Sequence, residues 1–259
     1  MMPEDDYMYM DLSVVNWLNS AGIDVVPIPS NINAAEAAAY FEYVHGLYLL
    51  PGWPNNPDFV RLVNTFLSMA VEANKVGDFF PVFGVCLGFQ MLLQHLGELG
   101  ALESMNSREL DKQTMLRFHP EHSESRVLQN AETHQVDYMK NRFRPFLNHN
   151  YGISLKRFMS TPTLSASFRI ISTSRDRKGT EYVSMVEGRS LPFYGSQFHP
   201  ELDTPNMDWL ARFFRNELAK SRHTGFPPRA APSLKEGKCI KESEYRVPCQ
   251  KLSVAHTTS

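Results

Sequence analysis

The sequence predicts an open α/β fold in which a mostly parallel sheet is covered by helices on both faces. Two observations predict it. Short apolar runs alternate with segments of helical periodicity, and the helical segments between the runs are long enough to act as crossovers. Strands joined by such crossovers run parallel, and their helices then cover both faces of the sheet. A chain of 259 residues is sufficient for one large domain of this kind.

The first third of the chain supplies most of the alternation. Val14 to Leu18 fits a helix that ends near Ala21-Gly22, and the β-branched stretch Ile23 to Ile28 predicts a strand. The alanine-rich stretch 34–43 predicts a second helix. Three further elements continue the pattern, namely a strand at 47–50, a helix through Phe59 to Leu67 and a strand at 81–85.

The second half of the chain is less regular. Between Glu103 and Lys156 the periodicity is weak, and no element is predicted there. Phe168 to Thr173 and Tyr182 to Val186 flank the turn-like residues 176–179, which predicts a hairpin. Phe193 to Phe198 predicts one more strand.

The last core element is expected between Trp209 and Leu218, where apolar residues form a helical stripe. Thr204-Pro205 would supply its cap and first turn. Beyond Thr224 the composition shifts to proline, lysine, serine and threonine, with too few apolar residues to offset the entropy of ordering. We therefore expect one domain at 1–224 and a disordered tail at 225–259.

The bulk composition excludes several classes of protein. A formal net charge of −2 leaves no basic excess for a nucleic-acid backbone. No apolar run approaches the roughly 20 residues of a membrane span, and the acidic start Met1 to Asp6 does not resemble a secretion signal. As written, the chain is expected to be cytoplasmic, with neither nucleic acid nor membrane as a partner.

The three cysteines, Cys86, Cys239 and Cys249, have no metal-like spacing, and their odd number argues against a disulfide framework. We expect no metal site, no cofactor and at least one free thiol.

The segment Gly84-Val85-Cys86-Leu87-Gly88 lies between a predicted strand and a predicted helix. A turn this tight needs glycines on both sides of the central residue, and it is the thiol version of a nucleophile elbow. The partial positive charge at the start of the helix favours thiolate over thiol. Although a lone cysteine is usually a small core residue, this setting predicts that Cys86 is a nucleophile.

Two groups could stabilise an oxyanion beside Cys86. The backbone N–H of Leu87 lies in the first turn of a helix and has no partner within that helix. The Pro51-Gly52-Trp53 turn follows the strand 47–50 and would end beside the elbow if the two strands are neighbours. We therefore nominate the backbone of Gly52 and Trp53 as the source of a second donor.

A base for Cys86 is expected in Phe198-His199-Pro200-Glu201. Residues two apart in an extended segment share a face, so Glu201 could bind one nitrogen of His199 and leave the other facing Cys86. A lone histidine near a strand end is more often structural. Because this histidine occurs together with the cysteine elbow, a catalytic role is favoured over a structural one. We interpret Cys86, His199 and Glu201 as a catalytic triad.

These motifs, in this order, resemble the class I glutamine amidotransferase-like superfamily and, within it, the γ-glutamyl hydrolases. The resemblance runs from about Tyr9 to Arg222. Its most specific segments are 77–89, Met185-Val186-Glu187-Gly188 and 194–201.

The resemblance implies hydrolysis of γ-linked glutamyl bonds, typically in folate poly-γ-glutamates, through a thioester on Cys86 with His199 as base and Glu201 as orienting acid. It also places His149 where such hydrolases have a further histidine near the active site, as a substrate-binding residue. The implied partner is a small-molecule folyl poly-γ-glutamate, and a homodimer is left open. Relatives of this kind are commonly vacuolar, lysosomal or secreted, so a longer N-terminus would change the expected location.

Two departures from the family pattern bear on fold and site. The family normally opens with a strand that this chain starts too late to include, so the sheet is expected to lack its first strand. Trp53 stands where the family usually has a second glycine after Pro51-Gly52. A bulky side chain there would narrow the pocket or alter the oxyanion hole.

Two other functions compete with hydrolysis. One is a glutaminase that supplies ammonia to a partner, as a subunit or domain, and the other is an inactive relative that acts as a binding protein. Because a poly-γ-glutamate tail is polyanionic, an arginine or lysine should line the crevice. The candidates that spacing leaves open are Arg108, Arg142, Lys156 and Arg175.

Overall fold

The computed structural model describes residues 7–53, 56–98, 100, 102–107, 114–225 and 249–253, with backbone alone for 7–9 and 249–253. The elements along the chain are β1 (Tyr7–Asp11), α1 (Leu12–Ser20), α2 (Ala34–Tyr43), β2 (Leu47–Leu49), α3 (Pro57–Lys75), β3 (Val82–Val85), α4 (Leu87–Leu96), β4 (Glu103–Ser104), β5 (Arg117–Phe118), the 3-10 helix η2 (Pro120–Glu124), α5 (Arg126–Gln129), α6 (Thr133–Asn141), β6 (Tyr151–Gly152), α7 (Leu155–Ser160), α8 (Pro162–Ser167), β7 (Phe168–Arg175), β8 (Glu181–Gly188), β9 (Phe193–Ser196), the 3-10 helix η3 (Pro200–Leu202), α9 (Asp208–Leu218) and β10 (Cys249–Ser253).

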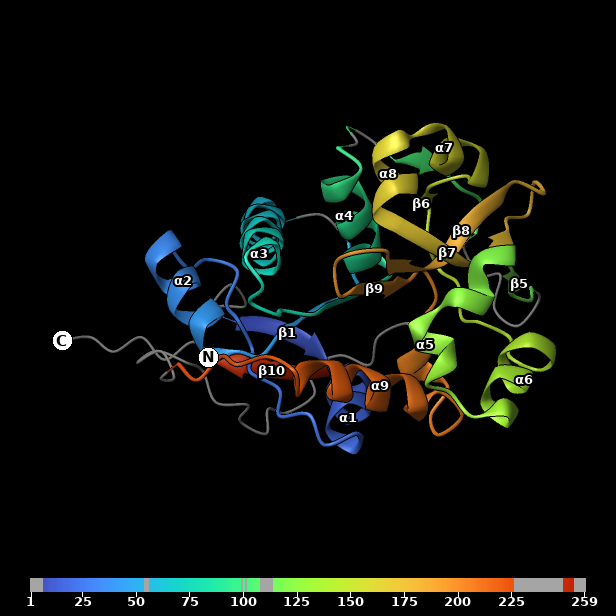
Figure 1. Cartoon of the computed structure of the whole chain (residues 1–259). Helices are drawn as coiled ribbons and strands as arrows, with labels where there is room; N and C mark the ends of the chain where they lie inside the picture. The colour runs from blue at the N-terminus through green and yellow to red at the C-terminus, as the bar shows by residue number, and fades with distance from the viewer. Residues whose placement is uncertain are drawn as a thin grey trace.

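A six-stranded sheet in the order β2-β3-β9-β8-β7-β5 forms the centre of the molecule (Figure 1). Strands β2, β3 and β9 are mutually parallel, whereas β8, β7 and β5 each pair antiparallel with the preceding strand in this order. Four of the six strands therefore run in one direction. The predicted α/β class is confirmed, and the antiparallel pairs come from the β7–β8 hairpin that the sequence predicts and from the short strand β5.

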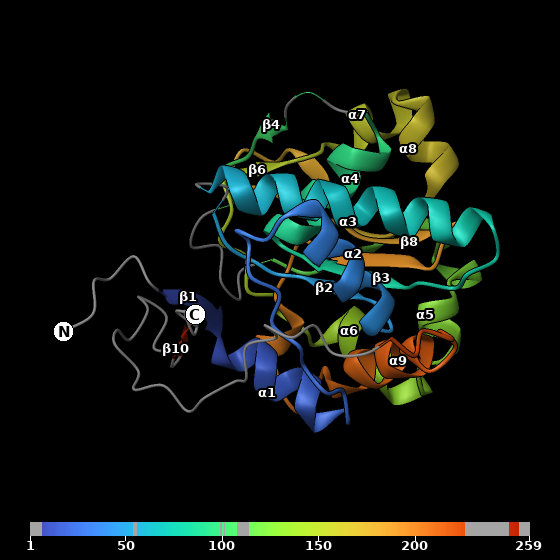
Figure 2. The same cartoon turned by 90° about the vertical axis from the view of Figure 1, so that its left-hand side faces the viewer.

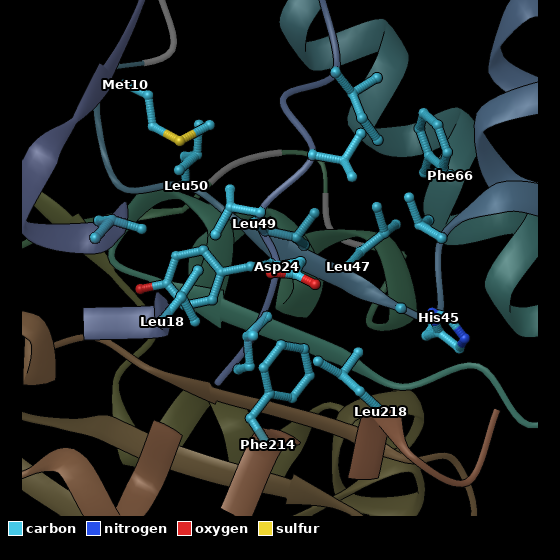
Figure 3. Close-up of a pocket in the computed structure, with 18 of the residues that line it drawn as sticks. Met10, Leu18, Asp24, His45, Leu47, Leu49, Leu50, Phe66, Phe214 and Leu218 are labelled. Carbon is cyan, nitrogen blue, oxygen red and sulfur yellow. The ribbon is translucent and has the colours of Figure 1, made fainter. Parts of the chain in front are cut away.

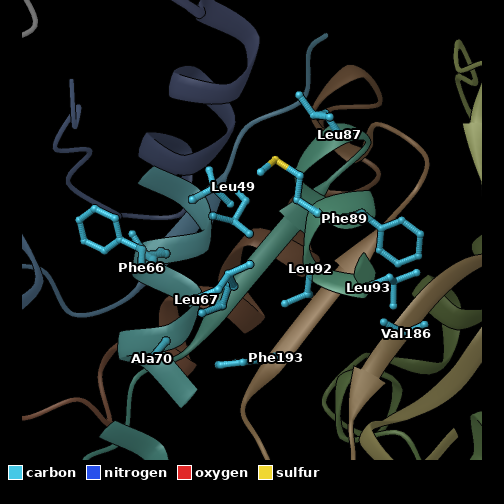
Figure 4. Close-up of a cluster of buried hydrophobic side chains, with 14 of the residues drawn as sticks. Leu49, Phe66, Leu67, Ala70, Leu87, Phe89, Leu92, Leu93, Val186 and Phe193 are labelled. Carbon is cyan, nitrogen blue, oxygen red and sulfur yellow. The ribbon is translucent and has the colours of Figure 1, made fainter. Parts of the chain in front are cut away.

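Helices cover both faces of the sheet and divide the core in two. On one face, α3 buries Leu62, Val63, Phe66, Leu67 and Ala70, which recur every three or four residues and so form one stripe. These residues pack with α4 and the apolar side of the sheet (Figure 4). On the other face, α1 and α9 pack beneath β2 and β3 (Figure 2).

Local signals explain where several helices begin. The side chain of Asn33 accepts hydrogen bonds from the backbone N–H groups of Ala35 and Glu36, and the carboxylate of Glu36 accepts one from the backbone N–H of Asn33, which completes a capping box for α2. Asn56 caps α3 in a similar way, and Pro57 occupies the first turn of that helix.

The structure confirms most of the predicted elements and corrects two. Ile23 to Ile28 is not a strand, because it forms no ladder with another strand of the described chain. Thr204-Pro205 does not cap the last helix, because α9 begins at Asp208 and its N-cap residue is Met207. The region without predictions contains only short elements from β4 to α7, too short for periodicity to reveal.

The expected tail lies mostly outside the described residues, as do Arg108 and Cys239. Within it, Cys249–Ser253 forms β10, which pairs antiparallel with β1 in a separate two-stranded sheet. The backbone at 7–11 is thus a strand that does not join the main sheet, and β2 is an edge strand of that sheet. None of the described helices combines the length and the apolar character that crossing a membrane requires.

Candidate active site

The segment around Cys86 is a strained strand-to-helix turn, as the flanking glycines predict. Cys86 joins β3 to α4 with φ 51° and ψ −103°, a positive-φ conformation that residues with side chains rarely adopt. Its backbone N–H donates to the carbonyl of Ser196 at 2.9 Å, and its carbonyl accepts from Gln90 N–H at 3.0 Å. The turn is therefore fixed both to the neighbouring strand β9 and to the helix that follows.

Close backbone packing explains why glycine stands at position 88. A Cβ placed on Gly88 would lie 2.3 Å from the carbonyl oxygen of Leu49, far inside van der Waals contact. The backbone N–H of Gly88 donates to the carbonyl of Leu50 at 3.1 Å. The first turn of α4 is thus packed directly on the carboxyl end of β2.

The parallel strands β2, β3 and β9 deliver the site residues to one edge of the sheet. Val85 is in register with Ser196, so Cys86 and the residues after β9 emerge side by side. Open α/β sheets form their crevice at this edge, beyond the carboxyl ends of the strands.

His199 lies between Cys86 and Glu201, the three residues that the sequence predicts to act together. Nδ1 of His199 lies 2.7 Å from Oε1 of Glu201, and Cys86 lies close enough to His199 for its charge to raise the pKa of the imidazole. Since Nδ1 faces Glu201, Nε2 is the nitrogen left for the sulfur. Glu201 lies in the 3-10 helix η3 and not in the extended segment that the sequence suggests, yet the three residues are brought together.

Electrostatics favour the charged form of His199. Burial lowers the pKa of this imidazole, but the negative charges of Glu201 and Cys86 outweigh burial and raise the pKa well above its ordinary value. The side chain of Glu201 is 2% exposed, so its charge acts on the ring with little solvent screening. The arrangement is suited to an imidazolium beside a thiolate.

The three nominated oxyanion donors lie in two neighbouring segments. Leu87 is the first residue of α4, where the N–H has no acceptor within its own helix. Gly52 has φ 149°, and a Cβ placed on it would lie 4.0 Å from the Leu87 side chain. Trp53 follows with its side chain 51% exposed. The turn after β2 therefore ends beside the elbow, as predicted from neighbouring strands.

His149 lies close enough to the triad for the charge of His199 to act on it. Its Nδ1 lies 2.9 Å from the carbonyl of Tyr151, and its Nε2 lies 3.3 Å from the hydroxyl of Tyr182. Burial is the main cause that lowers the pKa of His149 to about 4, and the charge of His199 adds to it. His149 is therefore neutral near pH 7, and its contact with substrate stays a prediction.

Three of the four cationic candidates lie within the described residues, and two of these three form ion pairs. Arg142 lies 3.8 Å from Asp137 in an exposed ion pair, and Arg175 lies 3.6 Å from Glu181. Lys156 is on α7. Which cation binds a substrate carboxylate stays a prediction.

Two residues near the site were not predicted from the sequence. The phenol of Tyr48 is buried, and its pKa is raised well above 10 by burial and then by the charges of Glu201, Asp11 and Cys86. Gln90 donates from Nε2 to the carbonyl of Tyr151 at 2.7 Å and to Oε1 of Gln197 at 3.1 Å. Tyr48 reads as an ordinary strand residue, whereas the position of Gln90 one helical turn after Cys86 could have marked it.

Comparison with known proteins identifies the family of this chain. Residues 5–217 match the family model for glutamine amidotransferase class-I. A solved structure from Thermoplasma acidophilum, described as part of a GMP synthase, superposes with a TM-score of 0.50 at 19% identity, covering 80% of this chain and 85% of that one. At that identity the likeness shows the fold.

Sequence relatives narrow the assignment. γ-Glutamyl hydrolase of Rattus norvegicus is 30% identical over 234 residues, covering 83% of this chain and 73% of the relative. γ-Glutamyl hydrolase of Mus musculus is 33% identical, covering 74% of this chain and 61% of the relative, and γ-glutamyl hydrolase B of Dictyostelium discoideum is 27% identical, covering 83% and 67%. The chain thus spans roughly two-thirds of the length of these relatives. It belongs to the class I glutamine amidotransferase family and, within it, to the γ-glutamyl hydrolases.

Proposed function

We propose that this chain hydrolyses the γ-glutamyl bonds of folate poly-γ-glutamates through a thioester on Cys86. The observation that carries the proposal is the juxtaposition of Cys86, His199 and Glu201 at the carboxyl edge of the sheet, where Glu201 contacts Nδ1 of His199 at 2.7 Å and Cys86 is close enough to raise the pKa of the ring. The names of the relatives favour hydrolysis over ammonia supply to a synthetase, since they are hydrolases of this bond type.

In the first half of the reaction, the Cys86 thiolate attacks the carbonyl carbon of the γ-amide. The carbonyl oxygen takes up negative charge, which the N–H of Leu87 and an N–H of the Gly52-Trp53 turn would stabilise. Imidazolium His199 then donates its Nε2 proton to the amide nitrogen. The C–N bond breaks, the amine leaves, and the acyl group remains on sulfur as a thioester.

In the second half, neutral His199 accepts a proton from water as the water oxygen attacks the thioester. Collapse of the second tetrahedral intermediate breaks the C–S bond, releasing the γ-carboxylic acid and restoring the thiolate and the imidazolium. Glu201 holds the ring in one orientation through Nδ1 and stabilises its charged form. Neutral His149 is proposed to contact the substrate from the wall of this crevice.

The direct test is incubation of purified protein with a folate pentaglutamate and identification of the products by mass. We expect shortened folates and released glutamate or short γ-glutamyl peptides. Cys86→Ala should reduce turnover to background while its melting temperature stays near that of the parent. Full turnover by Cys86→Ala would contradict the nucleophile assignment.

A matched control removes a different thiol. Cys239→Ala should retain full activity, because the mechanism uses one sulfur. Iodoacetamide should label Cys86 near neutral pH faster than it labels a small peptide thiol, since only the thiolate reacts. A rate no faster than that of the peptide would favour an inactive relative over an enzyme.

A further inference from the structure

Glu201 has one carboxylate oxygen that the contact with His199 does not use. Its Oε1 lies 2.7 Å from Nδ1 of His199, whereas its Oε2 is buried and has no hydrogen-bond partner among the described residues. Only 2% of the Glu201 side chain is exposed, so bulk solvent does not reach this oxygen. A buried carboxylate oxygen without a donor is costly and rare in native proteins, so a further group is expected to donate to it.

The hydroxyl of Tyr48 has the complementary deficit. It is also buried, and it has no hydrogen-bond partner in the part of the chain that the structure describes. A phenol has one proton to donate, and burying it without an acceptor is unfavourable. After burial, the charge of Glu201 is the largest cause that raises the pKa of this phenol, ahead of the charges of Asp11 and Cys86. The nearest strong acceptor without a partner is thus Glu201.

The direction of the Tyr48 side chain agrees with this pairing. Side chains alternate along a strand, and Leu47 and Leu49 on either side of Tyr48 belong to the core beneath α3. Tyr48 packs instead against the core beneath α1 and α9. Figure 3 shows both sides of β2, with Phe66 on the side of the two leucines and Phe214 on the other. The phenol therefore lies on the α1 side of the sheet, at a cavity of about 500 Å³ that borders β2.

Aromatic contacts hold the Tyr48 ring on that side. It stacks on Phe83 of β3, with ring centroids 6.0 Å apart and an interplanar angle of 3°. Trp17 of α1 meets it edge-on at 6.1 Å and donates from Nε1 to the carbonyl of Met207 at 3.3 Å. Helix α1 also contacts η3, the short helix that contains Glu201. The phenol is thus fixed next to the segment that carries the Glu201 carboxylate.

Asp11 is the other carboxylate close to the phenol, but it already has donors. Its Oδ1 accepts from the backbone N–H of Ser13 at 2.9 Å and from the hydroxyl of Ser13 at 2.8 Å. The Asp11 side chain thereby caps α1. Oε2 of Glu201, in contrast, is buried and accepts from no residue that the structure describes. Glu201 is therefore the acceptor that lacks a donor.

We propose that Tyr48 is a positioning residue, whose hydroxyl holds Oε2 of Glu201 through a hydrogen-bonded bridge of one water. The two atoms are not bonded to each other directly in this structure. A water that bridges two buried polar groups bonds nearly as well as a direct contact does. With Oε2 held in this way, Oε1 stays aligned with Nδ1 of His199. This role presupposes the proposed hydrolase function, since it serves the base of that reaction.

The test is a double-mutant cycle that combines Tyr48→Phe with Glu201→Gln. Tyr48→Phe keeps the ring and removes only the hydroxyl. NMR titration should show that it lowers the pKa of His199 in the parent, because the carboxylate loses its alignment with Nδ1. In the Glu201→Gln background, Tyr48→Phe should leave this pKa unchanged, since an effect that acts through Glu201 disappears with that carboxylate.

Hydrolysis of a folate pentaglutamate gives a second readout. Tyr48→Phe should lower kcat about ten-fold and change KM by less than about two-fold, because a misaligned base slows the reaction without removing a substrate contact. In the Glu201→Gln background it should cause no further loss of kcat. The titration needs no turnover, so a chain that failed to hydrolyse this substrate would contradict the proposed function while the titration still decided the role of Tyr48.

Tyr194→Phe is the matched control, because it also removes the hydroxyl of a buried tyrosine. The hydroxyl of Tyr194 donates to Oε2 of Glu217 at 2.9 Å, and Glu217 belongs to α9 and not to the segment of the triad. The pKa of His199 and kcat should therefore match those of the parent. The melting temperature of each variant shows whether it is folded.

Four results would overturn the proposal. Three come from folded variants, namely a His199 pKa that Tyr48→Phe leaves unchanged or raises, an equal fall of that pKa in both backgrounds, and an equal loss of kcat in both. The fourth is a crystal structure of the parent in which Oε2 of Glu201 contacts neither Tyr48 nor a water that Tyr48 holds. This last measurement decides the matter even if Tyr48→Phe does not fold, and the expected bridge has O–H···O distances of about 2.5–3.0 Å.

Discussion

The two edges of strand β2 differ in how they are supported. On the inner edge, β3 is fully buried and the elbow packs backbone on backbone, with Gly88 donating to Leu50. On the outer edge lies a cavity of about 500 Å³ lined by both cores. The positions of Cys86 and His199 depend on the inner edge and on β9, while the turn at Gly52 depends on β2 itself. The comparison shows that Cys86 and His199 are held by paired strands inside the sheet, whereas Gly52 is held only by a strand at the edge of the sheet.

The largest expected effect tests the chemistry of the inner edge. His199→Asn should lower kcat by about 10⁴-fold, the upper range for loss of a general base. The cause is loss of the proton carrier between sulfur, amide nitrogen and water. Steady-state hydrolysis of a folate pentaglutamate measures this loss, and His134→Asn, at an exposed site, is the control. A loss below ten-fold would remove His199 from the mechanism.

The next effect tests the packing of the inner edge. Gly88→Ala should lower the free energy of unfolding by roughly 4 kcal/mol, because its Cβ would meet the Leu49 carbonyl oxygen at 2.3 Å and the backbone must shift. Urea denaturation measures this change. Gly179→Ala is the control: nothing lies within 4 Å of its Cβ, so only the positive φ of 81° opposes it, at about 1 kcal/mol. Equal losses in the two variants would contradict the close packing.

The third effect concerns the buried histidine beside the triad. Burial lowers the pKa of His149 to about 4 in the folded protein, against about 6.5 when unfolded. As the pH falls, the unfolded state therefore takes up a proton on His149 before the folded state does. The contribution of His149 to the free energy of unfolding is fully present above pH 6.5 and is lost between pH 6.5 and pH 4. The difference between the two pKa values corresponds to about 3 kcal/mol in the free energy of unfolding.

Urea denaturation between pH 7 and pH 4 checks the sign and the size of this effect. His149→Asn should show a shallower loss of stability than the parent across that window. His134→Asn, at an exposed position, should follow the parent curve. Parallel curves for His149→Asn and the parent would show that His149 is not buried in its neutral form.

The smallest expected effect concerns the orienting carboxylate. Glu201→Gln should lower kcat about 10²-fold, because the amide can still hydrogen-bond Nδ1 but no longer stabilises the imidazolium. The pKa of His199 should fall, since Glu201 is the first of the charges that raise it. NMR titration of the ring measures that fall, with Glu72→Gln on the exposed face of α3 as control. An unchanged pKa would assign Glu201 a packing role only.

The sequence predicted which residues lie together at the candidate site better than it predicted their local conformation. Glycines at 84 and 88 around Cys86 are a local requirement of the turn, so the motif alone identified the elbow. The predicted contact between His199 and Glu201 is present, although Glu201 lies in the 3-10 helix η3 and only His199, which precedes that helix, is extended. Tyr48 was missed because its proximity to Glu201 and Cys86 arises from the neighbouring strands and not from its own segment.

Local sequence by itself determined the helices, the hairpin and the elbow, because periodicity, caps and glycine positions act within a few residues of one another. Whether Ile23 to Ile28 joins a sheet was decided only by the tertiary structure, since a strand needs a neighbour to pair with. The distance between Cys86 and His199 was likewise decided by the pairing of β3 with β9, which connects residues more than a hundred positions apart in the chain. Side-chain chemistry can be read locally, whereas proximity depends on which strands pair.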